Sequence, residues 1–251
     1  MKLAVVGGTG LIGTKLVARL RDGGHDVVAI ARATGVNSYT GEGLAEALEG
    51  VQTIIDTSNS GYFDDRAATD FFYASTLNLL TYGAAAGVQH HVALSVVGTD
   101  RLAASEGGYF IAKDAQEKLI RESGRPYTIV HSTQFFEFVK SIADAATIGN
   151  VVRLSQAFIQ PIAADDVAEL VARAALAAPV NGMIEIAGPD RFRLEQLVRT
   201  QLRLREDPRE VVADPLARYF GTELDERELL PADGATIAGT TFGEWLDAAP
   251  R

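Results

Sequence analysis

Residues 2–13 read KLAVVGGTGLIG, a short apolar run followed by Gly7, Gly10 and Gly13 at three-residue intervals. The apolar run predicts a buried strand, and the residues beyond the glycines predict a helix. Glycine lets the main chain approach a phosphate, and a helix N-terminus presents free N–H groups and a positive dipole end. We therefore expect a site for a dinucleotide pyrophosphate, whose contact residues are Gly7, Thr9, Gly10, Leu11, Ile12 and Gly13.

A tight turn that binds nothing is the alternative for this stretch. Its position favours a ligand, because it joins the first strand to an amphipathic helix at the start of the chain. A P-loop is excluded, since no Gly-Lys-Ser/Thr follows the glycines.

Composition restricts the class of protein. The chain has 251 residues, of which 47% are hydrophobic, so we expect one domain over residues 1–251 with a substantial core. The net charge of −10 and the lack of Lys/Arg runs argue against nucleic acid or an anionic membrane as partner. There is no cysteine, and no apolar run approaches the roughly 20 residues of a membrane span. We expect a cytoplasmic protein that binds a small molecule.

Apolar runs alternate with helical patterns as far as about residue 131, which predicts repeated β-α units. The expected helices are Leu11–Arg21, Leu44–Leu48, one within Asp64–Ala86, Tyr109–Ser123, Asp165–Ala177 and Leu194–Leu204. The fold class is therefore α/β, a Rossmann-like doubly wound parallel sheet with ligands at the carboxyl ends of its strands. The pattern then loosens, and residues after about 205 are charged and weakly periodic. We expect about 189–251 to form a small C-terminal lobe on the same domain, with Trp245 in a short closing helix.

The end of the second predicted strand indicates which dinucleotide binds. NAD-binding units carry an Asp or Glu there for the ribose hydroxyls. Here Val27–Ile30 is followed by Ala31 and Arg32, with no carboxylate. The guanidinium of Arg32 suits a 2′-phosphate, so we expect NADP(H) rather than NAD, the alternative being an arginine that only solvates the strand end.

Among the seven tyrosines, only Tyr109 has a lysine four residues later, at Lys113. Residues four apart share a helix face, and an ammonium beside a phenol lowers the phenol pKa toward neutrality. Ser95 follows Val92-Ala93-Leu94 near the end of the predicted strand His91–Val96, which places its hydroxyl at the carboxyl edge of the sheet. A hydroxyl that only caps the turn at Gly98 is the alternative for Ser95.

The glycine spacing, Arg32, Ser95 and the Tyr109/Lys113 pair resemble the short-chain dehydrogenase/reductase superfamily over most of the chain. Further segments are similar to its atypical, NmrA-like branch: Asn78-Leu79-Leu80, Gly87-Val88, Pro126-Tyr127-Thr128-Ile129-Val130, Pro161-Ile162, Asp166-Val167-Ala168 and Glu185-Ile186-Ala187-Gly188-Pro189.

The resemblance implies that Tyr109 donates a proton, Ser95 hydrogen-bonds a carbonyl oxygen, and Lys113 binds the nicotinamide ribose. It also implies that the loop with Thr57 and Ser58 runs beside the nucleotide, while Ser132, Thr133 and Gln134 border the nicotinamide. The chain departs from the family pattern at two points. His131 stands where relatives commonly place arginine, and the usual active-site asparagine has Asn78 as its nearest counterpart.

Phe135 and Phe136 are either a wall for a flat apolar substrate or plain core. His90 and His91 point to opposite faces of a strand, so no metal site is expected.

The hypothesis that follows from the sequence is an NADPH-dependent reductase of a small ketone or aldehyde, with Tyr109 as proton donor. Two alternatives stay open: a quinone or enone reductase that does not use Tyr109, and a nonenzymatic NADP(H)-sensing regulator. The oligomeric state, monomer or homodimer, is open too.

Overall fold

The computed structural model describes residues 1–60, 65–103 and 108–248 of the chain. Its main sheet has seven strands in the order β12-β9-β5-β4-β3-β1-β2. The pairings β1–β2, β1–β3, β3–β4 and β9–β12 are parallel, so the predicted doubly wound α/β fold is confirmed. The strands of this sheet are β1 (Lys2–Val6), β2 (Asp26–Ile30), β3 (Thr53–Asp56), β4 (His90–Val96), β5 (Tyr127–Ser132), β9 (Gly182–Ala187) and β12 (Thr236–Ile237).

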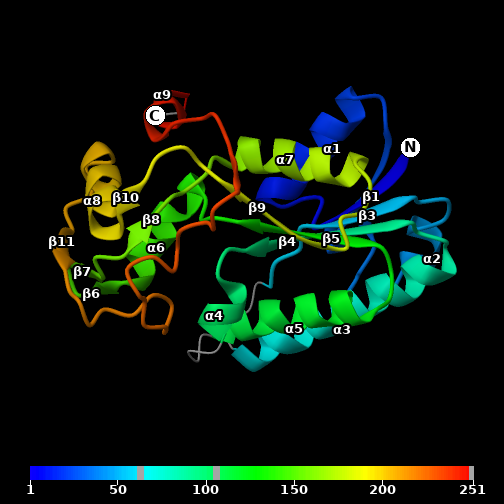
Figure 1. Ribbon diagram of the computed structural model, residues 1–251, viewed down its shortest axis with the longest axis horizontal. Coiled ribbons are helices and arrows are strands. Elements are labelled where there is room, and N and C mark those ends of the chain that lie inside the picture. The colour runs from blue at the N-terminus through cyan, green and yellow to red at the C-terminus, as the bar shows by residue number, and fades with distance from the viewer. Residues whose placement is uncertain (61–64, 104–107, 249–251) are drawn as a thin grey trace. The chain divides into compact units, whose positions relative to one another are not determined.

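Helices connect these strands and cover both faces of the sheet. Helices α1 and α7 lie on one face and α3 and α5 on the other (Figure 1). The connecting helices are α1 (Leu11–Asp22), the 3-10 turn η1 (Arg32–Thr34), α2 (Leu44–Ala47), α3 (Asp65–Ala85), α4 (Thr99–Ala103), α5 (Gly108–Glu122) and α7 (Ala164–Leu176). Except for η1 and α4, each was expected from its periodicity to within about two residues.

The order in which the strands are added to the sheet reverses at β1: β2 lies on one side of β1, and β3, β4 and β5 follow on the other side. β2 pairs with one edge of β1 and β3 with the other, and Val6 is level with both Ile30 and Asp56. The carboxyl ends of the three strands therefore lie side by side. In open α/β sheets ligands bind at such a switch point.

The core beside this point is apolar and closed. Ala4, Val6, Ile30 and Ile54 of the strands pack with Leu44, Leu48, Val51 and Leu79 of the helical connections, and each of these side chains is at most 2% exposed. This burial fixes the strand ends from which the site residues project.

The chain divides into two compact units. Unit 1 comprises Met1–Ser95, Gly108–His131 and Val167–Ile184, and unit 2 comprises Val96–Gly107, Ser132–Asp166 and Glu185–Arg251. The segment expected to form a C-terminal lobe, about 189–251, belongs to unit 2.

Unit 2 contains several short elements. β7 (Val151–Leu154) pairs in parallel with β11 (Glu210–Ala213) and antiparallel with β6 (Thr147–Ile148), while β8 (Phe158–Ile159) pairs with β10 (Phe192–Arg193). Its helical elements include η2 (Phe136–Phe138), α6 (Val139–Ala145), α8 (Leu194–Leu204) and α9 (Phe242–Ala248), so the short closing helix around Trp245 is present. Of these elements, β7 and α8 were expected at their observed bounds, and β6, β10 and β11 were not expected.

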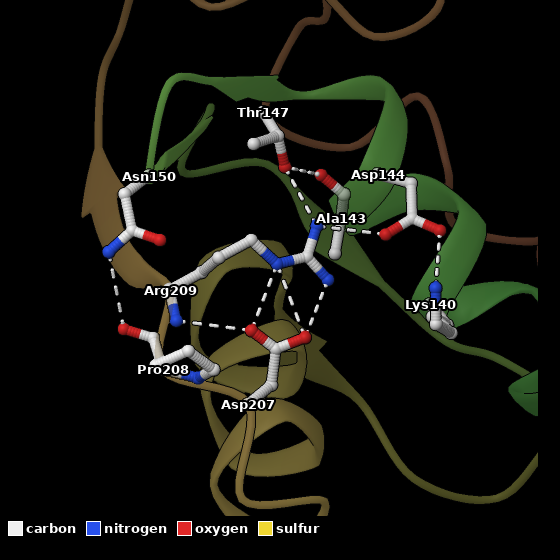
Figure 2. A network of polar contacts seen from close by, with 8 residues as sticks. All are labelled: Lys140, Ala143, Asp144, Thr147, Asn150, Asp207, Pro208 and Arg209. Atoms are coloured by element: carbon white, nitrogen blue, oxygen red, sulfur yellow. Dashed lines mark hydrogen bonds and ion pairs between the residues drawn. The ribbon is translucent and has the colours of Figure 1, made fainter.

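A polar network joins two parts of unit 2 that are distant in sequence (Figure 2). Arg209, just before β11, donates from Nε and Nη2 to the two carboxylate oxygens of Asp207, at 2.9 and 2.8 Å. Its Nη1 donates to Asp144 Oδ1 at 2.8 Å and to Thr147 Oγ1 at 2.9 Å, at the end of α6. A planar guanidinium fork can serve these acceptors at once, which a lysine cannot do.

Candidate active site

The glycine turn after β1 has the geometry that its sequence predicts. Gly7 has φ +74°, and its N–H donates to Ile30 O at 2.9 Å. A Cβ on Gly13 would lie 2.0 Å from Gly7 O, so the start of α1 can pack against the turn only without a side chain there. Gly10 caps α1 without any side-chain hydrogen bond, and the first turn of α1 holds no acidic residue.

This turn fits the pyrophosphate of a dinucleotide. Thr9, Gly10 and Leu11 are exposed, so the positive end of the α1 dipole faces solvent at the carboxyl edge of the sheet. Ile12 and Gly13, the other two predicted contact residues of α1, are buried beneath it. The backbone amides of the turn, rather than side chains, are therefore the groups that would meet a phosphate.

The loop after β3 lies directly against the turn. Thr57 donates from both its N–H and its Oγ1 to Val6 O, at 3.0 and 2.8 Å, and a Cβ on Gly7 would be 3.0 Å from Ser58 N. Ser58 Oγ is shielded from solvent and has no hydrogen-bond partner among the described residues. An unpartnered hydroxyl beside the glycines is consistent with a ligand at this position.

Arg32 is exposed at the first position of η1, directly after β2. The structure thus gathers Gly7, Arg32, Thr57 and Ser58 at the carboxyl ends of three neighbouring strands, as expected for one nucleotide site.

Ser95 and Lys113 are both buried in unit 1, at 3% and 2% exposure, whereas Tyr109 is only partly buried. Ser95 Oγ donates to Glu117 Oε1 at 2.5 Å. Lys113 Nζ donates to Leu94 O at 2.8 Å and to Gln116 Oε1. The three predicted residues therefore lie in one unit, and the polar groups of Ser95 and Lys113 have partners other than Tyr109.

Burial, rather than Lys113, sets the direction of the pKa shift of Tyr109 in this structure. Burial raises the pKa of Tyr109 to about 12, because a phenolate loses its hydration there. Lys113 Nζ donates to Leu94 O and Gln116 Oε1, and its effect on the phenol pKa together with a bound nicotinamide stays a prediction. Tyr109 is accordingly a neutral phenol near pH 7.

Glu117 is a buried residue of this region that the sequence reasoning missed. Its carboxylate accepts from Ser95, from His131 Nε2 at 2.8 Å and from Arg121 Nη1 at 2.9 Å. Burial opposes its ionisation, but the hydrogen bonds from His131 and Ser95 prevail and hold its pKa below the ordinary value. Glu117 lies four residues after Lys113, so helical spacing from Tyr109 was the signal that could have found it.

His131 and Asn78, the two departures from the family pattern, both have structural partners. His131 is buried against Glu117. Asn78 Nδ2 donates to the backbone oxygens of Ser38 and Tyr39, both at 2.9 Å, and so anchors the segment before α2.

The predicted residues from the end of β5 onward, beginning with Ser132, belong to unit 2. Ser132 Oγ donates to Thr133 O at 2.9 Å, and Thr133 Oγ1 is buried without a partner among the described residues. The side-chain amide of Gln134 has neither of its polar atoms paired within the described chain. The roles of these three residues beside the nicotinamide stay predictions.

Phe136 is core rather than a free substrate wall. It is fully buried, with its ring centroid 5.3 Å from both Phe242 and Trp245. Phe135 is partly exposed and packs on Phe138 at 5.6 Å. Of the two phenylalanines, Phe135 alone keeps surface for a ligand.

A cavity of about 400 Å³ lies elsewhere in unit 2, and none of the predicted site residues lines it. Its walls include Ser155, Ala157, Arg193, Glu195 and Glu226.

Among the described residues, no helix is both long and apolar enough to cross a membrane.

Comparisons with known proteins agree with this geometry. A family model described as NAD(P)H-binding matches residues 7–178. The Photosystem II assembly factor Ycf39 of Synechocystis sp. is 26% identical over 151 residues, which are 55% of this chain and 46% of that protein. The chain thus spans about half the length of the curated relatives it matches.

Solved structures show the same fold at low identity. MoeE5, solved with UDP-glucose and NAD, is 18% identical with a TM-score of 0.73, covering 98% of this chain and 96% of that one. QOR2 of Escherichia coli, a quinone oxidoreductase solved with NADPH, is 21% identical with a TM-score of 0.65, covering 86% and 78%. The expected NAD(P)H-binding family is confirmed by the family model, and the expected fold by these structures.

Proposed function

This chain belongs to the NAD(P)H-binding family, and we propose that it is an NADPH-dependent oxidoreductase that reduces the carbonyl group of a small apolar or aromatic ketone or aldehyde. The observation that carries the proposal is that one compact unit holds both the glycine turn and the helix with Tyr109 and Lys113. A fold that only sensed a nucleotide would not need a buried lysine and a neutral phenol four residues apart.

The residues at the carboxyl ends of β1 to β3 suit NADPH. The glycine turn would hold the pyrophosphate, and Arg32 would meet the 2′-phosphate with its fork of donors. No carboxylate follows β2 to receive the ribose hydroxyls of NAD, since Ile30 leads into Ala31, Arg32 and Ala33. When bound, NADPH supplies the hydride.

The protein's own contribution is the proton and the local field. Tyr109, a neutral phenol whose pKa burial raises to about 12, would donate its proton to the developing alkoxide. Lys113, fixed at Leu94 O, would stabilise the negative charge that remains. Ser95 could hydrogen-bond the substrate oxygen only after giving up its bond to Glu117.

The engagement of Ser95 favours a second candidate. With Ser95 bonded to Glu117 and Lys113 to Gln116, a quinone or enone reductase that delivers hydride without Tyr109 is also supported. The fold shared with QOR2 is consistent with this alternative. Both candidates need the same nucleotide site.

One experiment separates them: NADPH consumption measured with aromatic ketones, aldehydes and quinones for the wild-type protein and for Tyr109→Phe. We expect the variant to bind NADPH normally and to lose turnover by about 100-fold or more, the contribution of a positioned general acid. Unchanged turnover would assign the protein to the second candidate. NADPH binding without oxidation by any compound would instead indicate a nonenzymatic sensor.

A further inference from the structure

The ammonium of Lys113 is held from several sides. Its Nζ donates to Leu94 O at 2.8 Å and to Gln116 Oε1, and it lies 4.7 Å from the centroid of the Phe72 ring. Burial lowers the pKa of Lys113 to about 8, against the opposing pull of Asp56 and Glu117. A buried cation of this kind is sensitive to the placement of each acceptor around it.

The orientation of the Gln116 amide is dictated by its neighbours. A lysine ammonium only donates, so the amide oxygen must face Lys113 and the amide nitrogen must face an acceptor. That acceptor is Asp56 Oδ2, at 2.9 Å from Gln116 Nε2. Asp56 and Gln116 are each 1% exposed, so water does not complete this link.

Asp56 continues the link to the loop beside the glycine turn. Its other oxygen, Oδ1, accepts from the backbone N–H of Ser58 at 2.9 Å. Ser58 N lies where a Cβ on Gly7 would be 3.0 Å away. A continuous series of hydrogen bonds therefore links Ser58 N–H to Leu94 O: Asp56 accepts from both Ser58 and Gln116, and Lys113 donates to both Gln116 and Leu94.

We propose that Asp56 and Gln116 are positioning residues that fix the ammonium of Lys113 and couple its position to the Thr57–Ser58 loop of the nucleotide site. The pair acts through Lys113 and Ser58 rather than on the reacting atoms. Its kinetic consequence rests on the proposed function, whereas its effect on nucleotide affinity does not. A displaced loop should weaken nucleotide binding, and a displaced ammonium should slow turnover.

The direction of these hydrogen bonds provides a test by reversal of polarity. In Asp56→Asn, the new amide cannot satisfy both Ser58 N–H and Gln116 Nε2, since it would present a donor to one of them. In Gln116→Glu, the new carboxylate faces the buried carboxylate of Asp56, and the two negative charges repel each other. In the double variant, the new amide at position 56 donates to the new carboxylate at position 116, and every donor again meets an acceptor.

We would measure the Kd of NADPH by fluorescence titration, and kcat and KM with a carbonyl substrate, for the wild type, both single variants and the double variant. We expect each single variant to lower kcat by about tenfold or more, with KM for the carbonyl compound little changed. Each should also raise the Kd of NADPH several-fold. The double variant should recover both quantities to within about threefold of the wild type.

Glu169→Gln is the matched control, because it removes a half-exposed carboxylate of unit 1 that pairs with the exposed Arg19 and Arg173, at 3.6 and 3.0 Å. It should leave Kd and kcat unchanged. A double variant that is folded but no better than the worse single variant would overturn the proposal, as would single variants with wild-type Kd and kcat. If the wild type reduces no carbonyl compound, the proposed function fails, and recovery of the NADPH Kd alone decides for or against the coupling.

Discussion

At the scale of single residues, His90 makes stability depend on pH. Its side chain is 4% exposed and its Nε2 lies 2.9 Å from Thr128 Oγ1. Burial, with a smaller contribution from His91, lowers its pKa from 6.5 to about 4. Below pH 6.5 the unfolded chain therefore binds a proton that the folded protein refuses, so the stabilisation is complete above this pH and is lost as the pH falls toward 4.

We predict that the free energy of unfolding, measured with urea, is lower at pH 5 than at pH 7.5 by about 2 kcal/mol on account of His90. His90→Gln should remove this part of the pH dependence, because glutamine keeps a hydrogen-bonding group but does not titrate. His25→Gln, at a partly exposed position, should keep the wild-type dependence. Equal pH dependence in both variants would contradict the assignment to His90.

At the scale of elements, the junction of β1 and α1 depends on one missing side chain. Gly13→Ala would place a Cβ 2.0 Å from Gly7 O, so α1 must shift away from the glycine turn. We predict a loss of about 1–3 kcal/mol in unfolding free energy, the usual cost of overpacking. NADPH binding should weaken by about tenfold or more, since displaced backbone donors miss the phosphates.

Gly23→Ala, at the other end of the same helix, is the control. Gly23 has φ −74°, and a Cβ there would come no closer than 3.4 Å to Leu20 O. Urea unfolding and a fluorescence titration with NADPH should therefore give wild-type values. A Gly13→Ala protein with wild-type stability and affinity would show that the turn does not need close contact with α1.

Elements with a clear period could be predicted from the sequence, and those without one could not. Helix α8 was expected at its observed bounds because its apolar residues recur at helical spacing over Leu194–Leu204. Strands β6 and β10, each two residues long, are too short to show any alternation. Strand β12 joins the main sheet through two residue pairs with β9. This pairing depends on how a distant part of the chain folds back onto β9, which no local sequence pattern indicates.

At the scale of the whole molecule, the nucleotide site could be predicted from the sequence, whereas the partners of the reacting groups could not. Gly7, Arg32 and Ser58 could be placed together because their positions follow from backbone geometry at strand ends. The partners of Ser95 and Lys113 could not be predicted, since Glu117 accepts from the hydroxyl that was expected to meet a carbonyl oxygen, and Gln116 from the ammonium that was expected to meet the ribose. Which acceptor a buried donor selects is set by three-dimensional packing, which sequence spacing does not contain.

Nucleotide binding should stabilise the molecule as a whole, and the size of that effect measures the preference for NADPH. A ligand at 100 times its Kd adds about 2.7 kcal/mol to the unfolding free energy. For a chain of this size that corresponds to a rise in Tm of about 5–10 °C. We predict such a rise with NADPH and a clearly smaller one with NADH at the same concentration, because NADH has no 2′-phosphate for Arg32 to bind.

In Arg32→Ala the two nucleotides should give equal shifts in Tm, both close to the value for NADH with the wild type. Arg125→Ala, which removes another exposed arginine of unit 1, should retain the difference. An unchanged preference for NADPH in Arg32→Ala would mean that another group receives the 2′-phosphate. Because the measurement needs no turnover, it tests the nucleotide assignment independently of the reaction that the bound cofactor serves.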